Sequence, residues 1–178
     1  MKNITNDIKT FTWRFLAIHT ISYFIVGLAA MNLLHYEELF SKGSLGTFMK
    51  PTNAPIVALG PALQIVRGVI LAIVLWPFKS IFLSEEYGWL KLWLLFIGLS
   101  ILSTFGPAIG SIDGVIYTTI PIRQQLIFLP ELLIQSFLLS ISIWHWYSNP
   151  RKVYNIVATI LVALIVLMSI TGYFSLRM

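Results

Sequence analysis

Five apolar stretches, each about long enough to cross a bilayer as a helix, constrain this chain more than any other feature. A helix rises about 1.5 Å per residue, so roughly 20 apolar residues cross the hydrocarbon layer. Apolar residues make up 57% of the 178 residues and charged residues 11%, which leaves too little charge to cover a soluble domain. We therefore expect an all-α, polytopic membrane helical bundle, folded as a single integral membrane domain over residues 1–178. The predicted transmembrane helices are residues 11–34, 55–78, 87–105, 126–147 and 153–173.

The segment over residues 108–125, AIGSIDGVIYTTIPIRQQ, interrupts this pattern. Asp113 lies among glycines, which is typical of a turn, and the apolar run that follows is too short to cross a bilayer. We expect an irregular or re-entrant segment here, at the surface or dipping into the membrane. A sixth crossing at this point would move the carboxyl terminus to the other side.

Basic residues near the span ends predict the orientation of the bundle. Cytoplasmic segments of membrane proteins carry the excess of lysine and arginine. With five spans and the amino terminus inside, the cytoplasmic side receives seven: Lys2, Lys9, Arg14, Lys79, Lys91, Arg151 and Lys152. The other side receives four: Lys42, Lys50, Arg123 and Arg177. We therefore expect the amino terminus inside and the carboxyl terminus outside.

Arg67 lies near the middle of the second predicted span, with Gln64 one helical turn before it. A guanidinium at that depth is costly, and such residues usually face the bundle interior or a wet cavity and find a partner. Glu131 is the one acid in another predicted span, and Gln135 follows it by one turn. Arg67 and Glu131 are therefore candidates for a buried ion pair, although Glu131 is expected nearer the outer surface.

Two interpretations of this pair remain open. In the first, Arg67 holds an anionic group, and Glu131 orients that group or exchanges a proton with it. In the second, the ion pair and its two glutamines fix the register of the helices and do nothing else. The outer loops add polar side chains that suggest a pocket opening outward: His35, Glu37, Glu38, Asp113 and Arg123. The candidate ligand-binding residues are Gln64, Arg67, Asp113, Glu131 and Gln135.

The histidines and the absence of cysteine limit the cofactors that this chain could hold. A haem between His19 and His145 would need the two residues to face each other across a large gap. A histidine hydrogen-bonded inside the bundle is the simpler interpretation of His19. The chain has no cysteine, which excludes disulfides and thiolate chemistry, and it lacks the His-Glu-x-x-His and Gly-x-Ser-x-Gly motifs. We expect no metal and no cofactor.

The sequence favours a small integral membrane protein, in the plasma membrane of a bacterium, that binds or moves a small solute or lipid. It could equally serve as an accessory subunit of a membrane assembly. The expected partners are the lipid bilayer, a small-molecule or lipid ligand and another membrane protein, with no nucleic acid. The alternative is a membrane-embedded enzyme acting on a lipid-linked substrate, with Asp113 or Glu131 as acid or base and Arg67 as anion clamp. No motif assigns a catalytic residue.

Overall fold

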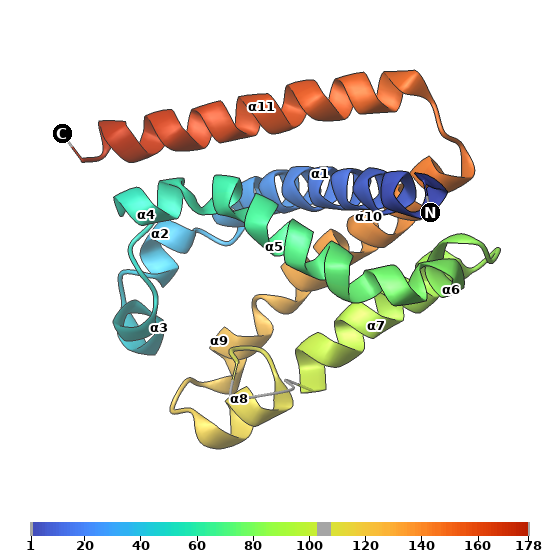
Figure 1. The fold of residues 1–178 in the computed structure, drawn as a ribbon. Helices are drawn as coiled ribbons and strands as arrows, with labels where there is room; N and C mark the ends of the chain where they lie inside the picture. Colours follow the sequence, from blue (N-terminus) through green and yellow to red (C-terminus); the bar gives the residue numbers. More distant parts are fainter. Residues whose placement is uncertain (1, 103–107, 178) are drawn as a thin grey trace.

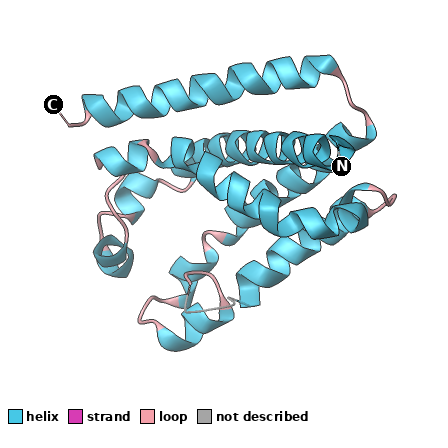
Figure 2. Ribbon diagram, viewed as in Figure 1, coloured by secondary structure: helices cyan, strands magenta, loops and turns pink. Residues whose placement is uncertain are grey.

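The computed structural model describes residues 2–102 and 108–177, and every regular element within these ranges is a helix (Figures 1 and 2). The elements are α1 (Lys2–Leu33), α2 (Tyr36–Leu39), α3 (Gly43–Phe48), α4 (Pro55–Ala58), α5 (Gly60–Leu75), the 3₁₀ helix η1 (Trp76–Phe78), α6 (Lys79–Leu83), α7 (Gly88–Leu102), α8 (Ile112–Tyr117), α9 (Ile122–Leu126), α10 (Leu129–Ser148) and α11 (Lys152–Ser175). The all-α prediction is therefore confirmed for the described residues.

Four stretches of the described chain are long and apolar enough to cross a membrane, judged by length and composition: Asp7–Leu33, Gly60–Leu83, Ile122–Ser148 and Lys152–Ser175. They correspond to the first, second, fourth and fifth predicted spans. The third predicted span corresponds to α7, which is apolar but has 15 residues. Its predicted end at residue 105 lies outside the described residues. Helices of this length and hydropathy are compatible with a small integral membrane protein.

The second span differs from its prediction at both ends. Pro77 does not end it, because the chain passes through the 3₁₀ turn η1 and continues as α6 to Leu83. Pro77 stands at the start of that turn, where its missing N–H removes no helical hydrogen bond. At the other end, Leu59 separates α4 from α5, and Pro61 falls in the first turn of α5. The uninterrupted helix therefore begins at Gly60 and not at Pro55.

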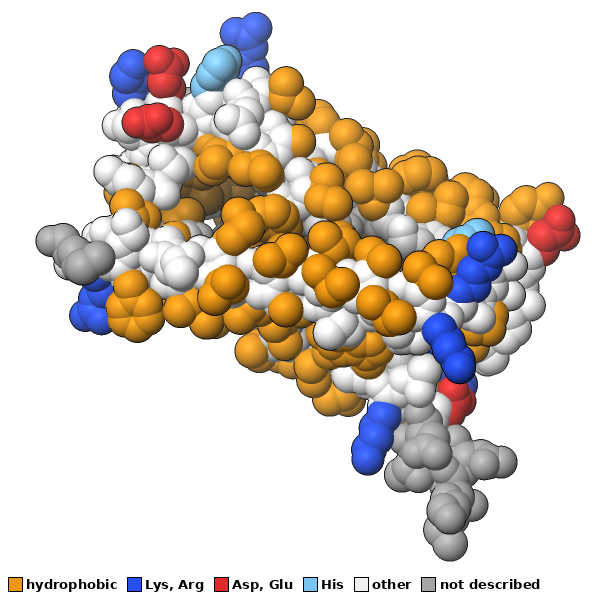
Figure 3. Space-filling model, turned by 90° about the horizontal axis from the view of Figure 1, so that it is seen from above, with side chains coloured by type: hydrophobic (Ala, Val, Ile, Leu, Met, Phe, Trp, Pro, Cys, Tyr) orange, Lys and Arg blue, Asp and Glu red, His pale blue; other side chains and the backbone are white. Residues whose placement is uncertain are grey.

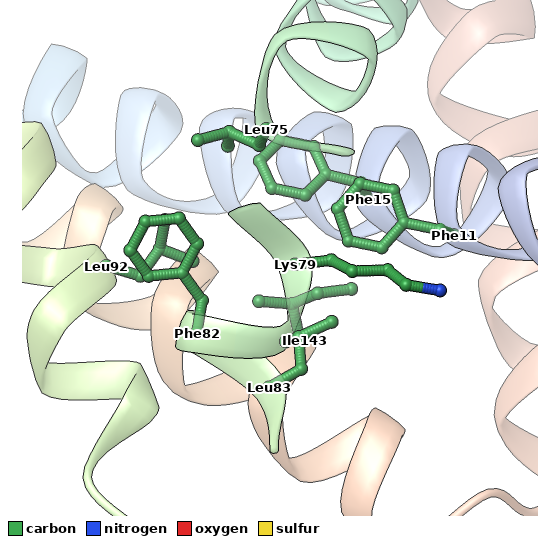
Figure 4. A pocket seen from close by; sticks show the side chains of 8 residues that line it. All are labelled: Phe11, Phe15, Leu75, Lys79, Phe82, Leu83, Leu92 and Ile143. Carbon is green, nitrogen blue, oxygen red and sulfur yellow. The ribbon is translucent and has the colours of Figure 1, made fainter. Parts of the chain in front are cut away.

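Helix α1 lies at the centre of the bundle, where it packs against α5, α10 and α11, while α7 packs against α10 and α6 (Figure 1). The main core forms where these helices meet, and its least exposed apolar side chains are Phe11, Phe15, Ala17, Ala72, Leu92 and Ile143. Between them lies a cavity of about 10 Å³ (Figure 4). That volume is about the room of one water molecule, and its lining is apolar apart from Lys79. This part of the core is therefore tightly filled.

Helix α11 lies along one side of the bundle (Figure 1). It buries one narrow face, made of Ala158, Val162, Ile165 and Ser169, and exposes most of its other apolar side chains. On the face of the molecule shown in Figure 3, apolar side chains cover the middle, and the charged side chains gather at the two ends. An apolar band between two charged ends is the surface that a bilayer requires.

Residues 108–125 form a small lobe of two short helices, α8 and α9. Gln125 is completely buried, and its amide nitrogen donates to the carbonyl oxygens of Gly114 and Ile120 at 3.0 and 2.9 Å. Ser111 caps α8 by accepting a hydrogen bond from the Gly114 N–H. The buried Gln125 amide therefore links α9 to α8 and to the connection between them. These hydrogen bonds give a regular fold to a segment that the sequence predicted as irregular.

Candidate functional site

Helices α1 and α5 approach each other closely at Gly68, which brings polar side chains of the two helices together. A Cβ atom on Gly68 would lie 2.8 Å from the Cα atom of Leu16, so the helices can pack this closely because the residue is glycine. One turn before Gly68, Gln64 Oε1 lies 3.2 Å from Nε2 of His19. His19 is buried, so this hydrogen bond satisfies one of its ring nitrogens. The expectation of a histidine hydrogen-bonded inside the bundle agrees with this geometry.

Glu131 is hydrogen-bonded to Tyr36 and forms no ion pair with Arg67 among the described residues. The Tyr36 hydroxyl, from α2, donates to Oε2 of Glu131, while Oε1 faces Gly27 of α1, whose Cβ would lie 3.8 Å away. Tyr36 itself packs against Phe128, with ring centroids 5.8 Å apart. Burial, and then the bond to the Glu131 carboxylate, raise the pKa of the Tyr36 phenol. This contact fastens the loop helix α2 to the start of α10.

Arg67 is exposed on α5 and forms no hydrogen bond or ion pair with any described residue. It lies near enough to His19 and Tyr23 of α1 for its charge to act on both. Because the uninterrupted helix begins at Gly60, Arg67 is about two turns, or ~10 Å, from its start. The charge of Arg67 therefore lies close to the contact between α1 and α5, although the side chain is exposed.

The two remaining predicted site residues are not joined to Arg67. Asp113 is in the first turn of α8, which contacts α7 and α9. Gln135 is half-buried, one turn after Glu131 on α10. No hydrogen bond or ion pair between described residues connects Asp113 with Glu131 or Arg67. The structure thus gathers two separate polar contacts, Gln64 with His19 and Glu131 with Tyr36, in place of one predicted centre.

A hollow of about 520 Å³ lies at the end of the bundle formed by α1, α2 and the α3–α4 connection. Its lining residues are Met31, Asn32, His35, Glu37, Glu38, Thr52 and Asn53. Of the loop residues expected around an outward pocket, His35, Glu37 and Glu38 line this hollow, and Asp113 and Arg123 do not. Neither Arg67 nor Glu131 lines it. The described residues contain no group of three or more His, Cys, Asp or Glu side chains that could hold a metal.

A second polar cluster, at the amino-terminal end of α1, was missed from the sequence. Asp7 forms an ion pair with Lys79 of α6 and accepts a hydrogen bond of 2.9 Å from the Tyr147 hydroxyl of α10. Arg14 lies over the rings of Trp146 and Tyr147, 5.6 and 5.5 Å from their centroids. Asp7 and Arg14 are seven residues apart, which puts them on one helix face. That spacing was the available signal for a shared environment.

His145 does not face His19, because its Nε2 atom lies 3.3 Å from the Tyr154 hydroxyl of α11 and the side chain is exposed. No family model, curated protein or solved structure matches this chain. The function is therefore inferred from the charges and contacts of the chain itself.

Proposed function

We propose that this chain is a small integral membrane protein with five crossings, its amino terminus in the cytoplasm, that binds an anionic membrane ligand at Arg67. The single observation that carries the binding role is the exposed side chain of Arg67, which has no ion-pair partner among the described residues, on a helix long enough to cross a bilayer. A charge in that position needs a counter-charge, because hydrocarbon does not solvate it. A ligand or a subunit outside this chain can supply it.

The arrangement of the helix ends supports an odd number of crossings. The amino terminus, the α6–α7 connection and the α10–α11 connection lie at one end of the molecule, and α2, α3, α4 and the carboxyl terminus lie at the other (Figure 1). The first of these ends carries the larger share of the basic residues. Counting α7 as the third crossing gives five, with the α8–α9 lobe in the outer interface. The exposed apolar side chains of that lobe suit an interfacial position: Ile112, Val115, Ile116, Tyr117 and Ile122.

The absence of cysteine makes this topology directly testable. Single cysteines at Asn53, Ser84, Asn149 and Leu176 would probe three connections and the carboxyl-terminal end, without labelling of any other residue of the chain. An impermeant thiol reagent applied to intact cells should label the first and last positions, and the other two only after permeabilisation. The opposite pattern would reverse the orientation. Labelling of Asn53 and Leu176 from different sides would exclude five crossings.

The binding role is tested on protein taken from its native membrane in polymer discs. Anionic compounds that copurify with the wild type should be depleted in Arg67→Gln, when both are extracted and compared by mass spectrometry. A subunit that copurifies in an Arg67-dependent way would instead support the accessory role. Identical sets of bound compounds and proteins in the two samples would rule out a binding role for Arg67.

A further inference from the structure

The acidic residues of this chain leave Arg67 without an internal counter-charge. Two of the seven acids lie in stretches that can cross a membrane, Asp7 and Glu131. Asp7 is bonded to Lys79 and Tyr147, and Glu131 is bonded to Tyr36. In a second copy of the chain the Glu131 carboxylate would likewise be half-buried against Tyr36 and Gly27 of its own chain, so a symmetric dimer does not present it to Arg67. The counter-charge for Arg67 therefore has to come from another molecule.

The surface around Arg67 indicates which chemical groups that molecule should carry. Leu63, Val66 and Ile70 are the neighbours of Arg67 along the exposed side of α5, and they are 47%, 59% and 57% exposed. One cation on an apolar face complements one anionic group carried on apolar chains. Arg67 is about two turns from the start of the uninterrupted helix at Gly60, and an arginine side chain can reach several ångströms toward that end. Its donors can thus meet a phosphate at the depth of the headgroups.

We propose that Arg67 binds the phosphate of an anionic phospholipid in the leaflet next to α4, with the acyl chains lying along Leu63, Val66 and Ile70. This assignment rests on the binding role proposed above and names its ligand class. Gln64 leaves the exposed face of α5 free for the lipid, because its hydrogen bond to His19 turns its side chain toward α1. The guanidinium offers two parallel donors to the phosphate oxygens, which a lysine ammonium cannot.

The test uses the purified full-length protein in neutral detergent, titrated with phosphatidylglycerol or phosphatidylcholine and observed by native mass spectrometry. The wild type should retain phosphatidylglycerol about tenfold more tightly than phosphatidylcholine, as expected for a charged hydrogen bond. Arg67→Gln should lose this preference, and Arg67→Lys should keep part of it. Arg151→Gln is the matched control, since it removes the same charge from an exposed site before α11 and should behave as the wild type.

A second variant keeps Arg67 in place and competes with the lipid. Leu63→Glu puts a carboxylate four residues before Arg67, in the orientation that favours an ion pair along a helix. This internal pair should abolish the preference for phosphatidylglycerol, so the test does not depend on Arg67→Gln folding. Size-exclusion chromatography and circular dichroism check the fold of each variant.

Three results would overturn the lipid assignment. The first is an undiminished phosphatidylglycerol preference in Arg67→Gln or Leu63→Glu. The second is equal retention of the two lipids by the wild type. The third is a protein complex of the wild type that Arg67→Gln dissociates, which would make Arg67 a contact between chains. If the native membrane still yields an Arg67-dependent anion while phosphatidylglycerol is not preferred, the proposed binding role stands and the lipid class is wrong.

Discussion

Charged residues in two regions of the bundle differ in the contacts that they form with the rest of the chain. At the amino-terminal end, Asp7, Lys79 and Arg14 contact ions or rings from other helices. In the first half of α5, Arg67 is exposed and forms no ion pair with any residue that the structure describes. The contacts of Asp7, Lys79 and Arg14 hold α1, α6 and α10 together, whereas Arg67 forms no such contact between described helices. The comparison separates charges that hold the fold from a charge that is free to bind.

The packing of both regions depends on the close approach of α1 to α5. We therefore expect the largest effect on the free energy of unfolding at Gly68. In Gly68→Ala the new Cβ would lie 2.8 Å from the Leu16 backbone. We expect the free energy of unfolding in mixed micelles to fall by about 1–3 kcal/mol, as for other overpacked sites. Gly60→Ala is the control, because no atom lies within 4 Å of its added Cβ. Equal stability of the two variants would show that α1 and α5 are farther apart.

We expect the next largest loss of stability at Tyr36, because its hydroxyl, and not Arg67, is the hydrogen-bond partner of Glu131. Tyr36→Phe leaves the half-buried Glu131 carboxylate without its donor. We expect a loss of about 2 kcal/mol in the free energy of unfolding. Tyr154→Phe removes a more exposed hydroxyl, 3.3 Å from His145, and should cost clearly less. If Tyr36→Phe were neutral and Glu131 then paired with Arg67, the contrast between the two regions would disappear.

The pKa of Tyr36 adds a pH dependence to this contact. Because burial and the Glu131 bond raise the pKa of the phenol, the folded protein favours the neutral form more than the unfolded chain does. That contribution is complete below the ordinary tyrosine pKa of about 10 and is lost as the pH rises toward the folded value. The free energy of unfolding should therefore fall more steeply above about pH 10 in the wild type than in Tyr36→Phe. Parallel curves would mean that Tyr36 does not titrate differently on folding.

The ion pair of Asp7 and Lys79 should show a smaller effect, measurable as a coupling energy. A double-mutant cycle with Asp7→Asn and Lys79→Gln should give about 0.5–1 kcal/mol, since both side chains remain partly exposed. The pair of Glu85 and Lys91 is the matched reference, with side chains 51% and 47% exposed, and its coupling should be nearer zero. A larger coupling for this exposed pair would contradict the view that the amino-terminal cluster ties helices together.

Hydrophobic length predicted the long helices, because crossing a bilayer and forming an apolar helix make the same demand on the sequence. It did not predict the backbone details within them. A 3₁₀ turn carries the chain past Pro77, and a break at Leu59 separates α4 from α5. The contact of Glu131 was not predictable, because its donor Tyr36 comes from a loop whose fold depends on tertiary packing.

The smallest expected effect on stability distinguishes Arg67 from Arg14 of α1. Arg67→Gln removes a charge that contacts no charged group among the described residues, so the free energy of unfolding in neutral detergent should change by less than about 0.5 kcal/mol. Arg14→Gln should cost about 1 kcal/mol, because Arg14 is half-buried over two aromatic rings. The loss in Arg67→Gln relative to the wild type should grow when phosphatidylglycerol is added, since a ligand that binds only the folded state stabilises the wild type by RT ln(1 + [L]/Kd). A loss in Arg67→Gln as large as in Arg14→Gln, without added lipid, would mean that Arg67 has an internal partner after all.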